Sequence, residues 1–182
     1  IINKEKIMKK AIVGIVMGSD SDLSTMKESA KVLERFKIPY EMTISSAHRS
    51  PERTIDYTKR AEKRGLKVLI VGAGGAAHLA GVIASYTTLP VIGVPMHTEV
   101  LKGRDSLYSI VQMPKGVPVA TMAIGKSGAV NGAIMAVEII ALSNTQVRKE
   151  LKRYREEMAK DVEKKGKRLE RLSYKKYSIS QE

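Results

Sequence analysis

Three short polar stretches of the sequence carry side chains that could do chemistry. The stretch Gly18–Asp22 contains two serines and two aspartates, residues 45–50 place a histidine beside an arginine, and residues 72–78 join glycines and alanines to a histidine. Carboxylates in a turn suit a metal ion, a sugar hydroxyl or a helix cap, whereas hydroxyls and backbone N–H groups suit a phosphate. The first stretch alone therefore leaves its ligand open.

His48 is the residue best suited to move a proton. It is one of three histidines in the chain, and it stands beside Arg49 just before a helix signal. A histidine can take or give a proton near neutral pH, and an arginine can hold a phosphate or carboxylate through two parallel hydrogen bonds. A loop histidine alone is more often a surface residue, but the neighbouring polar stretches favour an acid–base role.

The first stretch combines two further chemistries. Ser21 or Asp22 is expected to cap the helix that follows, which leaves Ser19 and the other acid for a ligand. A helix N-terminus favours an anion, so Ser19 is a natural phosphate contact, while an ionised aspartate is a natural acceptor for ribose hydroxyls. A ribose phosphate would use both groups.

Residues 72–77 fit the loose dinucleotide-binding pattern G-x-G-x-x-[GA], with Glu99 near the place of a ribose-binding acid. The match is weak because the pattern follows the third apolar run and its continuation places His78 in the first turn of the expected helix. Glycines that let the helix pack close to the sheet explain the pattern equally well. A bare backbone would also let a flat heterocycle lie against it, and this is the use we favour.

Phosphate-loop and metal signals are weaker still. The stretch Gly125–Ser127 resembles the end of a P-loop, but Ala120 occupies the place of the required first glycine. The histidines lie far apart in sequence, the chain has no cysteine, and only Gly18–Asp22 clusters acids. The sequence therefore predicts no metal site.

The elements that must position these groups follow from the apolar pattern. Short runs rich in Val and Ile recur at residues 11–17, 38–44, 67–71, 89–95 and 117–124, with helical patterns between them. Such an alternation is typical of a doubly wound α/β fold with a parallel sheet covered on both faces. Ligands of such sheets bind beyond the carboxyl ends of the strands, so the three polar stretches are expected to converge on one edge.

Helix signals are strongest around the second polar stretch. Ser50 and Pro51 fit an N-cap and a first helical residue, and Gly65 fits the end of the same helix. Helices are also expected over residues 23–36, 76–86 and 128–142, the last two rich in small residues. The five apolar runs and these helices make one catalytic domain over residues 11–143. An N-terminal extension, residues 1–10, precedes it, and we leave this extension out of the fold.

Residues 144–182 have a different composition. An apolar stripe among charged residues predicts a long amphipathic helix from Thr145 that fades into a polar tail near Tyr177. Such a helix usually covers a neighbouring subunit, although a basic face could also serve a membrane or RNA. We favour subunit packing.

Overall charge and composition narrow the function further. The net charge of +13 comes almost entirely from residues 1–67 and 148–182, and the chain has no Trp and one Phe. This distribution favours solvated outer helices over a base-stacking, nucleic-acid-binding surface. No apolar run approaches the roughly 20 residues of a membrane span, and cysteine is absent, so we expect a cytoplasmic protein.

Several ordered motifs resemble the PurE family of N5-carboxyaminoimidazole ribonucleotide mutases. The resemblance runs from about residue 11 to 143, and its motifs are Met17–Asp22, Ser46–Pro51, Gly74–Leu79 with Gly81, Leu89–Pro95, Gln112–Pro114 and Gly116–Ala120. It implies a flavodoxin-like three-layer core, an octamer, and a step of de novo purine synthesis. In that step a carboxylate moves from the exocyclic nitrogen of an aminoimidazole ribonucleotide to a ring carbon, without biotin, metal or nucleotide cofactor.

The resemblance also implies a role for each matching residue. His48 would be the general acid and base, His78 would line the carboxylate or carbon dioxide pocket, and Asp22 would bind the ribose hydroxyls. The remaining substrate contacts would be Ser19 and Arg49 at the phosphate, and Ser46, Gly74, Ala76 and Leu79. Asp20 and Ser21 would then support the turn.

Two alternatives stay open. A related branch of the family carboxylates the aminoimidazole ribonucleotide directly with carbon dioxide, and its members typically carry Lys after the histidine and lack the Gly-Gly-Ala-Ala-His stretch. Arg49 and His78 therefore favour the mutase. The alternative of another class is a nucleotide- or RNA-binding module built on Gly72–Ala77 and the basic tail.

Overall fold

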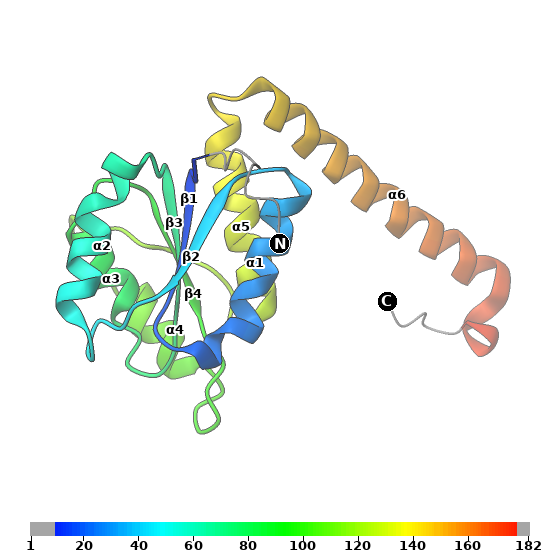
Figure 1. The fold of residues 1–182 in the computed structure, drawn as a ribbon. Helices are drawn as coiled ribbons and strands as arrows, with labels where there is room; N and C mark the ends of the chain where they lie inside the picture. Colours follow the sequence, from blue (N-terminus) through cyan, green and yellow to red (C-terminus); the bar gives the residue numbers. More distant parts are fainter. Residues whose placement is uncertain (1–9, 178–182) are drawn as a thin grey trace, which may run out of the picture. The chain divides into compact units, whose positions relative to one another are not determined.

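A parallel sheet forms the centre of the first structural unit (Figure 1). The structure, a computed structural model, describes residues 10–177. Its strands are β1 (Val13–Met17), β2 (Tyr40–Ile44), β3 (Val68–Ala73), β4 (Val91–Pro95) and β5 (Ala120–Thr121), in the order β2-β1-β3-β4-β5. Every pairing is parallel. This strand order is that of flavodoxin-like sheets, so the predicted fold class is confirmed.

Burial explains why some strands have wholly apolar sequences and others do not. Every residue of β1, β3 and β4 is buried, which requires apolar side chains on both faces, whereas the edge strand β2 is only half-buried. The strand predicted over 117–124 is much shorter than expected, because only Ala120 and Thr121 pair with β4. Pro118, which has no N–H to donate, lies just before this pairing.

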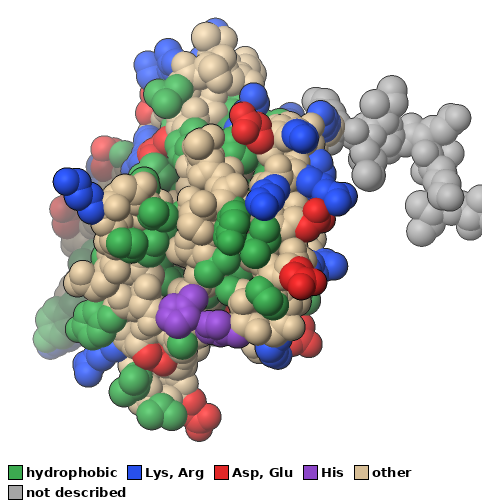
Figure 2. Space-filling view, turned by 90° about the vertical axis from the view of Figure 1, so that its left-hand side faces the viewer, with side chains coloured by type: hydrophobic (Ala, Val, Ile, Leu, Met, Phe, Trp, Pro, Cys, Tyr) green, Lys and Arg blue, Asp and Glu red, His purple; other side chains and the backbone are tan. Residues whose placement is uncertain are grey.

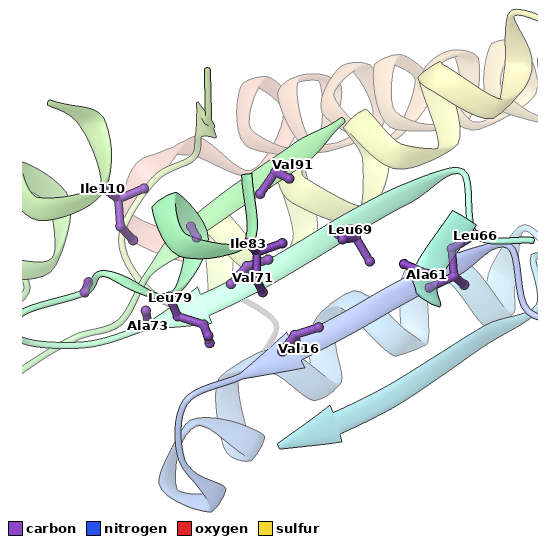
Figure 3. Packing of buried hydrophobic residues seen from close by; sticks show 12 residues of the cluster. Val16, Ala61, Leu66, Leu69, Val71, Ala73, Leu79, Ile83, Val91 and Ile110 are labelled. Atoms are coloured by element: carbon purple, nitrogen blue, oxygen red, sulfur yellow. The ribbon is translucent and has the colours of Figure 1, made fainter. Parts of the chain in front are cut away.

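Helices cover both faces of the sheet (Figure 1). On one side lie α1 (Leu23–Arg35) and α5 (Lys126–Ala141), and on the other lie α2 (Pro51–Arg64) and α3 (Leu79–Ser85). A further helix, α4 (Arg104–Val111), follows β4 and was not predicted from the sequence. Figure 3 shows the core on the side of α2 and α3, where Val16, Leu69 and Val71 of the sheet pack with Leu79 and Ile83 of α3.

Helix boundaries match the sequence signals in part. Pro51 is the first residue of α2, and Gly65 ends it in the left-handed conformation at φ 99°. The helix predicted from residue 76 was placed too early, since α3 begins at Leu79 and His78 is its N-cap. The glycine-rich loop turns before the helix begins: Gly75 has φ 66°, and the His78 N–H donates to the Ala76 carbonyl at 2.8 Å.

Residues 141–177 belong to a second compact unit. It contains α6 (Thr145–Lys176), which begins at Asn144, whose side-chain oxygen accepts hydrogen bonds from the N–H groups of Gln146 and Val147. The predicted long C-terminal helix is confirmed, with a non-helical residue at Ser173. None of its residues is buried. Residues 1–9 of the predicted extension and 178–182 of the tail lie outside the described residues.

Candidate active site

The loops beyond the carboxyl ends of the strands meet around a cavity of about 410 Å³. Because the sheet is parallel, these loops leave it at one edge, as predicted from the apolar pattern. Every residue predicted as a catalytic or substrate contact lines this cavity: Ser19 and Asp22 after β1; Ser46, His48 and Arg49 after β2; and Gly74, Ala76, His78 and Leu79 after β3. The cavity is large enough for a small nucleotide.

Two histidines from different loops are hydrogen-bonded to each other. The Nε2 atom of His48 lies 2.7 Å from the Nδ1 atom of His78, and the rings meet edge to face with their planes at 89°. Histidine side chains also gather visibly on one face of the molecule (Figure 2). One of the two facing nitrogens must donate and the other accept, so the contact holds a single exchangeable proton. The His48 ring is thus held in place by a side chain that can share a proton with it.

The turn after β1 is organised by its own side chains. Asp20–Asp22 form a short 3-10 helix, and Ser19 caps it by accepting a hydrogen bond from the Ser21 N–H at 3.3 Å. Asp22 is the N-cap residue of α1, one of the two residues expected there, but its side chain makes no capping hydrogen bond. The side-chain capping bond belongs instead to Ser19, at the start of the 3-10 turn.

Burial raises the pKa of the Asp22 carboxyl above its ordinary value of 3.8. Hydrogen bonds from the Ser19 backbone and the Ser21 side chain oppose this effect, as does the charge of Arg49, while the charge of Asp20 adds to it. Burial thus disfavours the ionised form of this carboxyl more than its hydrogen bonds favour it. A ligand that donates hydrogen bonds to Asp22 would stabilise the carboxylate.

This raised pKa predicts a pH dependence of stability. Between 3.8 and the higher folded-state value Asp22 binds its proton more fully in the folded protein than in the unfolded chain, so its contribution to the free energy of unfolding should fall as pH rises through that window. Asp22→Asn should abolish this fall and give a protein more stable than the wild type at neutral pH. Urea unfolding between pH 3 and pH 7 measures both effects.

Asp20→Asn is the matched control, because it removes the same charge from the same turn at an exposed position. It should keep most of the fall in stability that Asp22 causes, because burial, the largest cause of the raised pKa, is unchanged and only the smaller contribution of the Asp20 charge is lost. An unchanged pH profile in Asp22→Asn would show that the carboxyl is not destabilised by its surroundings.

Arg49 connects the loops after β1 and β2. Its Nη2 donates to the Gly18 carbonyl at 3.0 Å, its backbone N–H donates to the Ser46 Oγ at 3.2 Å, and its Nε lies 3.5 Å from the same oxygen. The guanidinium carries five donors, so the contact with Gly18 leaves others for a ligand. The side chain is exposed and lines the cavity, where it can hold an anionic group.

A fourth loop completes the cavity and was missed in the sequence. Met96, His97 and Thr98, which follow β4, line it together with the three predicted loops. No motif in the sequence marks His97, the third histidine of the chain, as a site residue. The rule that placed the other loops, a polar residue directly after a buried apolar strand, applies equally to residues 95–98 and would have found it. Among residues 10–177, no group of three His, Asp or Glu side chains is arranged to hold a metal ion.

Comparisons with known proteins agree on one family. The model of the family described as AIR carboxylase matches residues 12–161. The chain is 55% identical over 169 residues to a protein of Pyrococcus horikoshii named N5-carboxyaminoimidazole ribonucleotide mutase, covering 93% of this chain and 94% of that protein.

A Thermotoga maritima protein of the same name is 55% identical over 165 residues, which cover 91% of this chain and 95% of the relative. Among solved structures, Treponema denticola PurE aligns with a TM-score of 0.79 at 28% identity, covering 86% of this chain and 97% of that one.

Proposed function

This chain belongs to the AIR carboxylase family, and we infer from that membership that it is an N5-carboxyaminoimidazole ribonucleotide mutase of purine biosynthesis. It is an isomerase that converts N5-carboxyaminoimidazole ribonucleotide to 4-carboxy-5-aminoimidazole ribonucleotide. The observation that carries this conclusion is identity to mutases over nearly the whole chain. The cavity at the strand ends adds the chemical groups that such a reaction needs.

Substrate placement follows from the charges around the cavity. Arg49 and Ser19 would contact the phosphate, and the carboxylate of Asp22 would accept hydrogen bonds from the ribose hydroxyls. Gly74 and Ala76, both exposed in the loop after β3, offer a backbone surface on which the flat imidazole can lie. Ser46 is a further contact beside Arg49, and Leu79 forms an apolar part of the wall.

The reaction then requires one proton to be given and taken back. Breaking the bond between the exocyclic nitrogen and the carboxylate releases carbon dioxide and leaves the bonding electron pair on that nitrogen, which takes up one proton. When the ring carbon attacks carbon dioxide, the new C–C bond leaves that carbon with both hydrogen and carboxylate, and removing the hydrogen as a proton restores the aromatic ring. His48 would give and receive these protons, and no other co-reactant is needed.

Retention of carbon dioxide is the second requirement. An escaping molecule ends the reaction, so the site must keep it close to the ring carbon, where recapture is effectively intramolecular. His78 lies beside His48 in the same cavity and would line the region that holds the carboxylate. Its hydrogen bond to His48 supports this proposal, since it would bring the proposed acid–base group next to the migrating group.

The test of this function compares two substrates. The enzyme is given the carbamate ribonucleotide alone, or the uncarboxylated aminoimidazole ribonucleotide with bicarbonate, and consumption of each is followed. We expect consumption of the carbamate, and consumption of only the second substrate would identify the direct carboxylase.

Thermal-shift measurements with NAD(P) and RNA complete the comparison, since stabilisation by these alone would support the binding-module alternative.

We further propose that the enzyme works as a homo-oligomer, an octamer as the family resemblance implies. Large apolar side chains exposed on the first unit support association, among them Val100 at 87% and Tyr108 at 63% exposure. Light scattering of the purified protein measures the mass, and a monomer would contradict the proposal.

None of the described helices is long and apolar enough to cross a bilayer. The cytoplasmic location stays a prediction that cell fractionation would check.

A further inference from the structure

The loop between β3 and α3 carries His78 into the site, but its backbone conformation is not fixed by its own sequence. Gly75 has φ 66°, and a Cβ atom built there would meet nothing within 4 Å. Glycine is thus used here for its conformation and not for lack of space. Because glycine adopts positive and negative φ about equally readily, another group must hold this peptide in place.

Ser106 of α4 supplies that contact. The N–H of Gly75 donates to the Ser106 Oγ at 3.0 Å, and the Ser106 side chain is completely buried. Ser109, one turn later, lies 3.4 Å from the Gly75 carbonyl, but its hydroxyl donates to the Asp105 carbonyl at 2.8 Å. A hydroxyl has one hydrogen to donate, so the contact through Ser106 is the firmer of the two.

The same helix holds a second loop of the cavity. Thr98, which lines the cavity, donates its hydroxyl to the Asp105 carboxylate at 2.8 Å and accepts the Gly103 N–H at 3.0 Å. The first turn of α4 therefore contacts the loops after β3 and after β4. A helix outside the cavity lining connects the backbone positions of two of its walls.

We propose that Ser106 is a positioning residue for the substrate pocket. By fixing the Gly75 peptide it holds the following loop so that the ring of His78 stays against His48 and the Gly74–Ala76 backbone faces the ligand. Neither Ser106 nor Gly75 lines the cavity, so Ser106 acts only through the loop. The inference rests on the proposed function, because its effect is read in the mutase reaction.

The experiment compares Ser106→Ala with Ser29→Ala. Ser29 is a matched control: it is completely buried in α1, and its hydroxyl makes one hydrogen bond to a backbone carbonyl, that of Ala129, at 2.7 Å. Both variants should lower the thermal midpoint by similar amounts. Only Ser106→Ala should lower kcat/KM, by about tenfold, the upper range for one lost hydrogen bond.

Hydrogen exchange provides a readout that needs no turnover. In Ser106→Ala the amide hydrogens of a peptide spanning residues 73–78 should exchange faster, whereas Ser29→Ala should leave that peptide as in the wild type. If Ser106→Ala does not fold, Ser106→Cys replaces the hydroxyl with a slightly larger thiol that is a weaker acceptor, and it should show the same changes at smaller size.

The outcomes separate the two proposals. An active wild type with Ser106→Ala kinetics equal to those of Ser29→Ala would overturn the positioning role and leave the function standing. A wild type inactive on both ribonucleotides would overturn the function, and the exchange measurement would still decide whether Ser106 orders the loop.

Discussion

Replacing His48 with asparagine is expected to lower kcat by roughly 10²–10⁴-fold, the usual contribution of a general acid–base group. Asparagine keeps a polar side chain of similar reach but cannot exchange a proton in the working pH range. His48 is exposed, so its loss should not destabilise the fold. Because the proposed substrate-binding contacts are made by other side chains, the Kd for the ribonucleotide should change little.

Two measurements check this expectation, steady-state turnover and equilibrium binding of a ribonucleotide. His97→Asn is the matched control, since His97 also lines the cavity and is also exposed, but the hydrogen bond between rings joins His48 to His78. It should retain most of the turnover. Full activity in His48→Asn would remove His48 from the mechanism, and equal losses in both variants would point to a general change in the cavity.

The second large effect is expected for Arg49→Met, which keeps an unbranched stem in place of the arginine stem and removes the guanidinium with its charge. If Arg49 holds the substrate phosphate, the variant loses a charge-assisted hydrogen bond worth about 1.5–3 kcal/mol, so KM should rise roughly 10–150-fold. The phosphate is remote from the reacting atoms, and kcat should therefore fall less than KM rises.

Arg53→Met is the control for this variant. Arg53 is also exposed, and its guanidinium likewise donates to a backbone carbonyl, that of Ile44, at 3.2 Å, but it does not line the cavity. Its loss should leave KM unchanged. A rise in KM of the same size in both variants would mean that general positive charge, and not a direct contact by Arg49, attracts the substrate.

Much of the fold could be predicted because burial leaves a strong trace in the sequence. β1, β3 and β4 are buried throughout, and their runs are apolar throughout. Parallel pairing then places the strand-end loops together, so the convergence of Ser19, His48 and His78 followed from local pattern plus topology. Their chemical roles remain predictions, since geometry alone does not show a proton transfer.

The parts that were missed depend on contacts distant in sequence. The segment Arg104–Val111 mixes polar and apolar residues, and two of its serines contact Gly75, about thirty residues earlier in the chain. No local sequence pattern predicts a contact between residues so far apart in the chain. The start of α3 was misplaced for a similar reason: residues 76–78 have helical composition, but the turn at Gly75 delays the helix to Leu79.

The polar groups of the site are already bonded to one another before any ligand arrives. Ser21 and Ser19 share a hydrogen bond of 2.9 Å, Arg49 contacts the Gly18 carbonyl, and His48 contacts His78. A ligand must exchange the serine and histidine bonds or use the guanidinium donors that Gly18 leaves over, and a neutral group gains little by an exchange. A phosphate gains more, because hydrogen bonds that involve an ionised group are roughly twice as strong as those between neutral groups. The enzyme should thus reject free nucleosides, which share the base and sugar of its substrate, without any clash to exclude them.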